Sequence, residues 1–251
     1  MPDNATIQPI HPFPARMAPD IALRACEALP PGSLVLDPML GSGTVARMAS
    51  EHGHRAIGFD MDPLAVLMSR VWTTPISPKE LRAGAADLIS GVEATRPEEV
   101  SLPWIEEDTE TEAFVRYWFG PEQRADLRRL SYKLHDLAGP VADALRIALS
   151  RIIVTKDRGA SLARDVSHSR PHKVREASCF PVIQEFAKSA ERLARQLALR
   201  PPSGGAEVRL GDARNLRGVS AECVDAVITS PPYLNAIDYL RGHKLSLVWL
   251  G

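Results

Sequence analysis

The feature that most constrains this chain is a short apolar run followed by an acid and a glycine-rich turn, Leu34-Val-Leu-Asp-Pro-Met-Leu-Gly-Ser-Gly-Thr44. The apolar residues predict a buried strand, and Asp37 stands where that strand ends. Gly41 and Gly43 let the backbone take positive φ and let a ligand approach closely, because no Cβ stands in the way. A helix is expected over residues 45–51, and its free N–H groups point back toward the turn. The pattern predicts a crevice for a nucleotide cofactor at the end of a parallel strand.

The glycine spacing alone leaves two classes of cofactor open. Gly41-Ser-Gly-Thr-Val-Ala46 fits the dinucleotide fingerprint of NAD-dependent dehydrogenases, and Asp60 follows about 20 residues on, as that fingerprint expects. Asp37 counts against a dehydrogenase, because an acid before the glycines would repel a pyrophosphate but could meet a positively charged ligand group. The segment Thr229-Ser-Pro-Pro-Tyr233 counts against it as well, since a dehydrogenase has no use for it. The dehydrogenase is therefore the less favoured alternative.

Two segments resemble the amino-group DNA methyltransferases that use S-adenosylmethionine. Residues 37–44 are similar to the cofactor loop of that family, and residues 230–233 are similar to its catalytic tetrapeptide; each follows a predicted strand. The resemblance covers residues 8–75 and 205–251 well and the middle of the chain more weakly. It implies a cofactor loop that includes Asp37, Pro38, Gly41, Gly43 and Thr44.

Other cofactor contacts are expected at the ends of two further strands and in the N-terminal arm. Residues 55–60 predict a second strand, whose terminal Asp60 can accept both ribose hydroxyls of an adenosine cofactor. Residues 207–213 predict a third strand, and in the family an acid at the position of Asp212 accepts the adenine amino group; a plain turn residue is the alternative. A proline-rich N-terminal segment covers the methionine end of the cofactor in the family, which would place Phe13 and Arg16 there. The alternative for that segment is a surface arm.

Residues 224–229 predict a fourth strand, which carries the tetrapeptide to the same edge of the sheet. An exocyclic amine on a base is a weak nucleophile, because its lone pair is delocalised into the ring. Hydrogen bonds from its N–H groups to Ser230 Oγ and to a carbonyl of Pro231 or Pro232 would aim that lone pair at the methyl group. Tyr233 could stack on a base that has left the duplex. In the family, Ser at the first position occurs more often with cytosine N4 methylation and Asp with adenine N6, so cytosine N4 is favoured; no metal is required.

A helical insertion is expected over residues 76–204. Residues 77–80 form a capping box, and helical runs are expected near 121–137, 140–154 and 181–199. Residues 98–112 hold seven acids and no base, which predicts a solvated linker. The order of cofactor loop, insertion and tetrapeptide suggests that the insertion carries target recognition.

The basic segment, residues 151–175, is the expected DNA contact within the insertion. It holds seven Lys or Arg against two Asp, which gives a net charge of +5. Arg and Lys provide affinity for phosphate, and the hydroxyls between them add hydrogen bonds; a solvated loop is the alternative. His168 and His172 straddle a proline, so a helical metal pair is not expected. The side chains expected on DNA are Arg158, Arg164, Arg170, Lys173 and Arg175.

Composition sets the remaining limits. The 251 residues are 45% hydrophobic and 24% charged, which fits a globular protein with a sizeable core. The net charge is −1, so any nucleic-acid contact must come from a local patch. Three widely spaced cysteines suggest neither a disulfide framework nor a zinc site. No signal peptide or long apolar run is found, which leaves a cytoplasmic protein without a membrane partner as the default.

These features predict a partial Rossmann-like methyltransferase sheet of about four strands with a helical insertion. The expected parts are 1–75 as the cofactor-binding half with the N-terminal arm, 76–204 as the insertion, and 205–251 as the catalytic half. The family's sheet has seven strands, so the resemblance implies that the C-terminal half is missing or comes from a partner, and that this chain alone transfers no methyl group. The expected substrate is double-stranded DNA with a flipped base, and a cognate restriction nuclease is a candidate partner. Two further functions stay open: an RNA or tRNA base methyltransferase, and a nucleic-acid-binding protein without activity.

Overall fold

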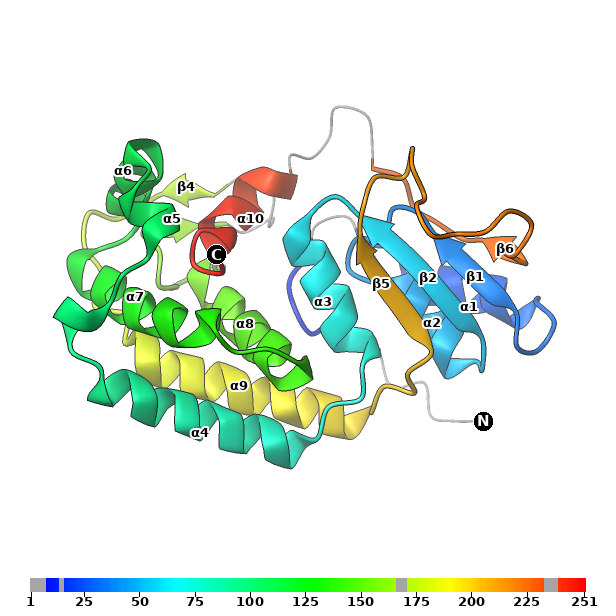
Figure 1. Ribbon diagram of the computed structural model, residues 1–251, viewed down its shortest axis with the longest axis horizontal. Helices are drawn as coiled ribbons and strands as arrows, with labels where there is room; N and C mark the ends of the chain where they lie inside the picture. The colour runs from blue at the N-terminus through cyan, green and yellow to red at the C-terminus, as the bar shows by residue number, and fades with distance from the viewer. Residues whose placement is uncertain (1–7, 14–15, 166–170, 233–238) are drawn as a thin grey trace. The chain divides into compact units, whose positions relative to one another are not determined.

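The computed structural model describes residues 8–13, 16–165, 171–232 and 239–251. The chain divides into two compact units, which are coloured by position along the chain in Figure 1. The first unit contains residues 1–75 and 196–234, and the second contains residues 76–195 and 235–251. The chain therefore passes three times from one unit to the other. The last helix, which the sequence groups with the catalytic half of the core, packs in the second unit.

A four-stranded parallel sheet is the centre of the first unit. Val35 pairs with Ala56 on one side and with Ala226 on the other, and Gly58 pairs with Val208. The α/β class and the four expected strands are therefore confirmed. Because all four strands are parallel, their carboxyl ends lie at one edge of the sheet. The strands, in the order β5-β2-β1-β6, are β1 (Leu34–Asp37), β2 (Arg55–Asp60), β5 (Ala206–Leu210) and β6 (Ala226–Val227).

Three helices complete the first unit: α1 (Pro19–Glu27), α2 (Thr44–Glu51) and α3 (Pro63–Thr73). Proline stands at the start of α1 and α3, where the missing N–H costs no hydrogen bond. Asp62 caps α3, since its carboxylate accepts a hydrogen bond from Leu64 N at 2.9 Å. Apolar side chains of α1 and α2 form one buried cluster with β1 and β2. Between β5 and β6, residues 211–225 form neither helix nor strand.

In the described part of the second unit, the regular structure is helical apart from one short antiparallel hairpin. Its core consists of buried side chains such as Leu81, Leu127, Ile147 and Phe186, each from a different helix. None of the helices in the described part of the chain has the length and apolar character needed to cross a membrane. The elements are α4 (Pro78–Ala94), the 3-10 helix η1 (Pro97–Glu99), α5 (Pro103–Glu106), α6 (Thr109–Trp118), α7 (Pro121–His135), α8 (Pro140–Ile153), β3 (Ala163–Arg164), β4 (His172–Lys173), α9 (Val182–Leu199), which ends in the first unit, and α10 (Tyr239–Leu247).

The acidic segment 98–112 is not the solvated linker that its charge predicts. It contains α5 and the first turn of α6, and its apolar residues Leu102 and Ile105 are buried. Trp104 Nε1 donates a hydrogen bond to Val248 O at 3.0 Å, and the Trp104 ring stacks on His135. Most of the acidic side chains remain exposed. The prediction was wrong because the charges describe only the side of the segment that faces solvent.

Candidate functional site

Three acids follow the carboxyl ends of three neighbouring strands of the first unit. Asp37 ends β1, Asp60 ends β2, and Asp212 stands two residues after β5. Gly211 N donates to Asp60 O at 2.9 Å, so the pairing of β5 with β2 continues up to the residue before Asp212. The structure thus brings the three predicted acids to one edge of the sheet, beside the glycine turn.

The glycine turn has the backbone that the sequence predicted. Gly41 has φ of +53°, and Gly43, the N-cap of α2, has φ of +83°. A Cβ on Gly43 would lie 2.7 Å from Ser69 Oγ, so no other residue fits there without a shift. Two further predicted loop residues flank the glycines: Pro38 is partly exposed, and Thr44 is buried. The turn leaves the first N–H groups of α2 without partners inside the helix, as a site for a polar ligand requires.

Asp37 is a buried carboxyl group, with 3% of its surface exposed. Met39 N donates a hydrogen bond of 3.2 Å to it, and the Thr229 hydroxyl lies beside it. Burial raises the pKa of Asp37 to about 6; the neighbouring Thr229 hydroxyl and Met39 N–H act in the opposite direction, and the charge of Asp60 raises the pKa further. Among the residues that the structure describes, no cationic side chain contributes to this pKa. Asp37 is therefore a buried acid that no described cation neutralises.

Asp60 already holds the glycine turn in place. One carboxylate oxygen accepts from Gly41 N at 2.7 Å, and the other accepts from Asp62 N at 2.9 Å. Both carboxylate oxygens of Asp60 are therefore used within the turn. The geometry gives Asp60 a structural role that the sequence did not indicate, in addition to the predicted ribose contact.

Asp212 is paired within its own turn. The Arg214 guanidinium bonds both carboxylate oxygens, at 2.9 and 3.0 Å from Nε, and Arg214 N donates to the same group. The Arg214 side chain and backbone hold the pKa of Asp212 at about 2. Asp212 is therefore ionised at neutral pH, and a ligand would share it with Arg214.

The N-terminal arm lies against the glycine turn. A Cβ on Gly41 would stand 3.2 Å from Phe13 Cε1, so the Phe13 ring covers the Cα of that glycine. Arg16 has one guanidinium nitrogen, Nη1, that is buried and has no hydrogen-bond partner among the described residues, and burial lowers the pKa of the group. The structure thus brings Phe13 into the predicted site and leaves Arg16 with an unused buried donor.

The first part of the tetrapeptide follows the short strand β6. Ile228 N donates to Leu36 O at 3.0 Å, which continues the pairing of β6 with β1. Ser230, Pro231 and Pro232 come next and are exposed. Tyr233 lies outside the described residues. The register places Ser230 beyond the carboxyl end of the strand next to Asp37, at the edge that carries the acids.

The expected DNA contacts belong to the second unit, around the hairpin of β3 and β4. Arg164 Nε donates to Lys156 O at 2.7 Å, and Arg175 bonds Asp157 O, so both brace the turn before the hairpin. Lys173 pairs with Glu176 at 2.9 Å. Arg158 is exposed, and Arg170 lies outside the described residues. The structure therefore brings four of the five predicted residues to one short hairpin and its turn.

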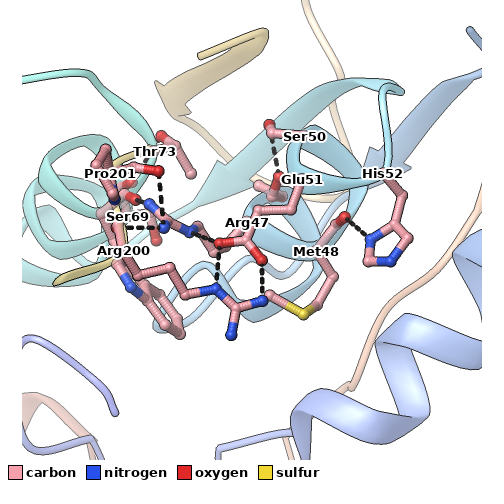
Figure 2. Close-up of polar contacts among 11 residues, drawn as sticks. Arg47, Met48, Ser50, Glu51, His52, Ser69, Thr73, Arg200 and Pro201 are labelled. Carbon is pink, nitrogen blue, oxygen red and sulfur yellow. Dashed lines mark hydrogen bonds and ion pairs between the residues drawn. The ribbon is translucent and has the colours of Figure 1, made fainter. Parts of the chain in front are cut away.

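Sequence reasoning missed a buried arginine in the first unit, Arg47 of α2, which is 1% exposed. Nη1 donates to Trp72 O at 2.6 Å, Nη2 donates to Arg200 O at 2.7 Å, and Nε bonds Glu51 of the same helix at 2.6 Å. Figure 2 shows Arg47 beside Glu51 and Arg200. Arg200 also bonds Glu51. The i, i+4 spacing of Arg47 and Glu51 in a short helical run could have drawn attention to the pair. The other partners of Arg47 could not be read from the sequence.

No cluster of His, Cys, Asp or Glu able to hold a metal ion is found among the residues that the structure describes. The arrangement at the sheet edge instead offers backbone donors, three carboxylates and an aromatic ring. These groups suit an organic ligand that carries hydroxyls and a positive charge.

Comparison with known proteins agrees with this arrangement over the first part of the chain. Residues 6–71 match the family model of N6/N4-type DNA methylases. The chain is 37% identical over 82 residues to a curated protein of Kocuria varians, "Type II methyltransferase M.MvaI"; the match spans 31% of this chain and 18% of that relative. No solved structure gives a significant match. The resemblance to the amino-group DNA methyltransferases is confirmed over residues 6–71, which contain Asp37, the glycine turn and Asp60.

Proposed function

We propose that this chain, a relative of the amino-group DNA methyltransferases, carries the cofactor site and the catalytic tetrapeptide of an enzyme that methylates DNA with S-adenosylmethionine. One observation carries the proposal. A glycine turn and three acids stand at the ends of three adjacent parallel strands, and Ser230-Pro-Pro follows the fourth. Ligands of open α/β sheets bind at this edge.

Asp37 supports a cationic cofactor over a dinucleotide. A buried carboxylate without a counter-charge is costly, and a positive ligand group would remove that cost. The sulfonium and ammonium groups of S-adenosylmethionine carry such charge, whereas the pyrophosphate of NAD would add negative charge beside two acids. The residues present therefore fit S-adenosylmethionine, which when bound supplies an activated methyl group.

The remaining contacts follow from where each residue stands. Phe13 and Arg16 would cover the methionine end, with the unused Arg16 donor available to its carboxylate. The turn at Gly41 would face the nucleoside, Asp60 would accept the ribose hydroxyls, and Asp212 would accept the adenine amino group. Asp60 and Asp212 would do so while keeping Gly41 and Arg214 as partners.

Ser230 and the proline carbonyls would orient the target amine. They accept hydrogen bonds from its N–H groups and so direct the nitrogen lone pair toward the methyl group. Tyr233 would stack on the flipped base. Ser230 at the first position favours cytosine N4 over adenine N6. The basic hairpin of the second unit would contact the DNA phosphates, and a restriction nuclease in the same cytoplasm is a candidate partner.

The cofactor assignment is tested by titration calorimetry of the 251-residue chain with S-adenosylmethionine and with NAD. We expect binding of S-adenosylmethionine alone. Asp60→Ala should weaken it about 30- to 150-fold, because a charge-assisted hydrogen-bonding group worth roughly 2–3 kcal/mol is lost. Asp60→Asn, which keeps one acceptor oxygen for Gly41 N, controls for collapse of the turn. Binding of NAD, or unchanged affinity of Asp60→Ala, would contradict the assignment.

The reaction is tested with a protein from the full reading frame, duplex DNA and a labelled methyl donor. Nucleoside chromatography of the digested product separates N4-methylcytosine from N6-methyladenine, and we expect the former. Transfer of the label to tRNA but not to DNA would replace the substrate in this proposal.

A further inference from the structure

We propose that the second unit carries an aromatic and basic surface that binds DNA through an unstacked base. The inference rests on the proposed function, because it concerns the same DNA substrate, and it adds a contact that is separate from the tetrapeptide. The surface, named the α6–β4 surface, lies where α6 and β4 are close together in the second unit (Figure 1). It consists of Phe114, Tyr117 and Trp118 of α6, Lys173 of β4 and Lys244 of α10.

The central side chain of the α6–β4 surface is an exposed tyrosine. Tyr117 stands in the last turn of α6 and is 54% exposed. Trp118 meets its ring edge-on, with 5.0 Å between the ring centroids and an interplanar angle of 88°. Phe114 in turn packs against Trp118 at 6.2 Å. The exposed ring is therefore supported by aromatic neighbours, and a supported ring loses little conformational entropy when it binds.

The ammonium groups of two lysines lie over these aromatic rings. Lys173 Nζ lies 4.8 Å from the centroid of Tyr117, and Lys244 Nζ lies 5.0 Å from that of Phe114. Lys173 also pairs with Glu176, but that carboxylate is 91% exposed, so solvent already weakens the pair and a phosphate can replace it. Aromatic rings with cations beside them are the combination that binds unpaired nucleic-acid strands.

The α6–β4 surface is continuous with the basic hairpin. Leu162 N donates to Trp118 O at 2.7 Å, and Val174 N donates to Leu162 O at 3.0 Å, so the hairpin is attached to the end of α6. Arg175 bonds Asp157 O and thereby holds the adjacent turn. Arg158 in that turn is exposed, and none of the described residues bonds or pairs with its side chain. A phosphate contact is therefore available beside the aromatic contact.

The exposed ring favours an unstacked base over an intact duplex. In a duplex the faces of each base are covered by its neighbours, and only the base edges are open in the grooves. A tyrosine can therefore stack only on a base that has left the helix. An enzyme that flips its target creates an unpaired position in the duplex, and the α6–β4 surface fits a base at such a position.

The experiment compares two labelled DNAs by fluorescence anisotropy with the 251-residue chain: a perfect duplex and the same duplex with one unpaired base. Tyr117→Ala should weaken binding of the second DNA about 5- to 150-fold, the equivalent of 1–3 kcal/mol for one stacked base. Its binding of the perfect duplex should stay as in the parent. Tyr117→Phe keeps the ring and should bind both DNAs as the parent does.

A variant that lacks two positive charges distinguishes the contribution of base stacking from that of phosphate contact. Arg158→Ala combined with Lys173→Ala should weaken binding of both DNAs and lower the slope of log affinity against log salt by up to about two units. Tyr117→Ala should leave that slope unchanged.

The matched control is Tyr132, which has Lys133 Nζ 5.6 Å from its ring but stands on α7, outside the α6–β4 surface. Tyr132→Ala should bind both DNAs as the parent does. Equal binding of the unpaired DNA by Tyr117→Ala and the parent would overturn the inference, as would binding of a protein partner at this surface without salt-dependent DNA binding. Loss of the proposed methyltransferase function would show separately, as failure to bind S-adenosylmethionine.

Discussion

Two buried charges of the first unit lie close together in the sequence and differ in how they are satisfied. Arg47, within α2, is 1% exposed, and Asp37, just before the turn that leads into α2, is 3% exposed. Arg47 bonds Glu51 and the carbonyls of Trp72 and Arg200. Asp37 accepts from one backbone N–H and faces the like charge of Asp60.

This difference distinguishes a buried residue that belongs to the fold from a buried residue that is a candidate for binding a ligand. A buried charge whose partners all come from the chain itself is part of the fold, because its removal leaves those partners buried and unpaired, whereas a buried charge without a counter-charge is a candidate ligand contact. Arg47 joins the place where the chain leaves the first unit, after Trp72, to the place where it returns, at Arg200. Asp37 is the residue whose charge the proposed cofactor would neutralise.

The largest loss of stability is expected from Arg47→Met. Removing the guanidinium leaves the carbonyls of Trp72 and Arg200 without this donor and leaves Glu51 with Arg200 as its remaining partner, so we expect a cost near the lower end of the range for a broken buried pair, about 3 kcal/mol. Urea unfolding should therefore show a much lower midpoint than in the parent. The matched control is Arg82→Met, which removes an exposed pair with Glu191 and should change little. Equal midpoints for the two variants would mean that Arg47 is not structural.

The second prediction concerns Asp37 and pH. Its pKa is raised from 3.8 to about 6, chiefly by burial, so the folded state binds the proton more tightly than the unfolded state. The resulting stability is fully present below about pH 4 and is lost as the pH rises through about 6. At pH 7 the carboxylate should destabilise the ligand-free fold by about 3 kcal/mol, taking about 1.4 kcal/mol per pKa unit.

The neutral variant Asp37→Asn should therefore be more stable than the parent at pH 7 and equal to it near pH 4. Urea unfolding at several pH values measures this difference. Calorimetry should show that the parent binds S-adenosylmethionine more tightly than Asp37→Asn at pH 7. The affinity of the parent should rise as the pH passes through 6, and the affinity of the variant should stay weak at every pH. Parallel stability curves for the two proteins would show that Asp37 carries no buried charge.

The smallest loss of stability is expected from a substitution in the glycine turn, which lies between Asp37 and Arg47 in the sequence. Gly43→Ala and Gly53→Ala both place alanine at positive φ, +83° and +75°, which costs about 1–2 kcal/mol in each case. Only the first also meets Ser69, because nothing lies within 4 Å of a Cβ on Gly53. Gly43→Ala should therefore lower the unfolding midpoint more than Gly53→Ala and should also weaken cofactor binding. Equal effects would mean that the turn adjusts without loss.

Much of the first unit could be predicted because its signals are local. Apolar runs ending in Asp37 and Asp60 predicted the strands, and Gly41 and Gly43 predicted a turn with positive φ. The partner of Trp104 was not predicted, because Val248 is 144 residues away. The structural role of Asp60 was missed for a related reason, since its bond to Gly41 depends on how two strand ends come together.

The sequence by itself determined the glycine turn, the acids at the strand ends, the tetrapeptide and hence the resemblance to DNA methyltransferases. Each of these is a short segment whose chemistry depends on its own residues. Only the tertiary structure decided that Arg47 is satisfied by a carbonyl 153 residues away, that Asp37 is buried without a counter-charge, and that Tyr117 stays exposed beside Lys173. Burial and long-range pairing depend on which distant segments pack together, and hydrophobic periodicity along the chain does not specify that.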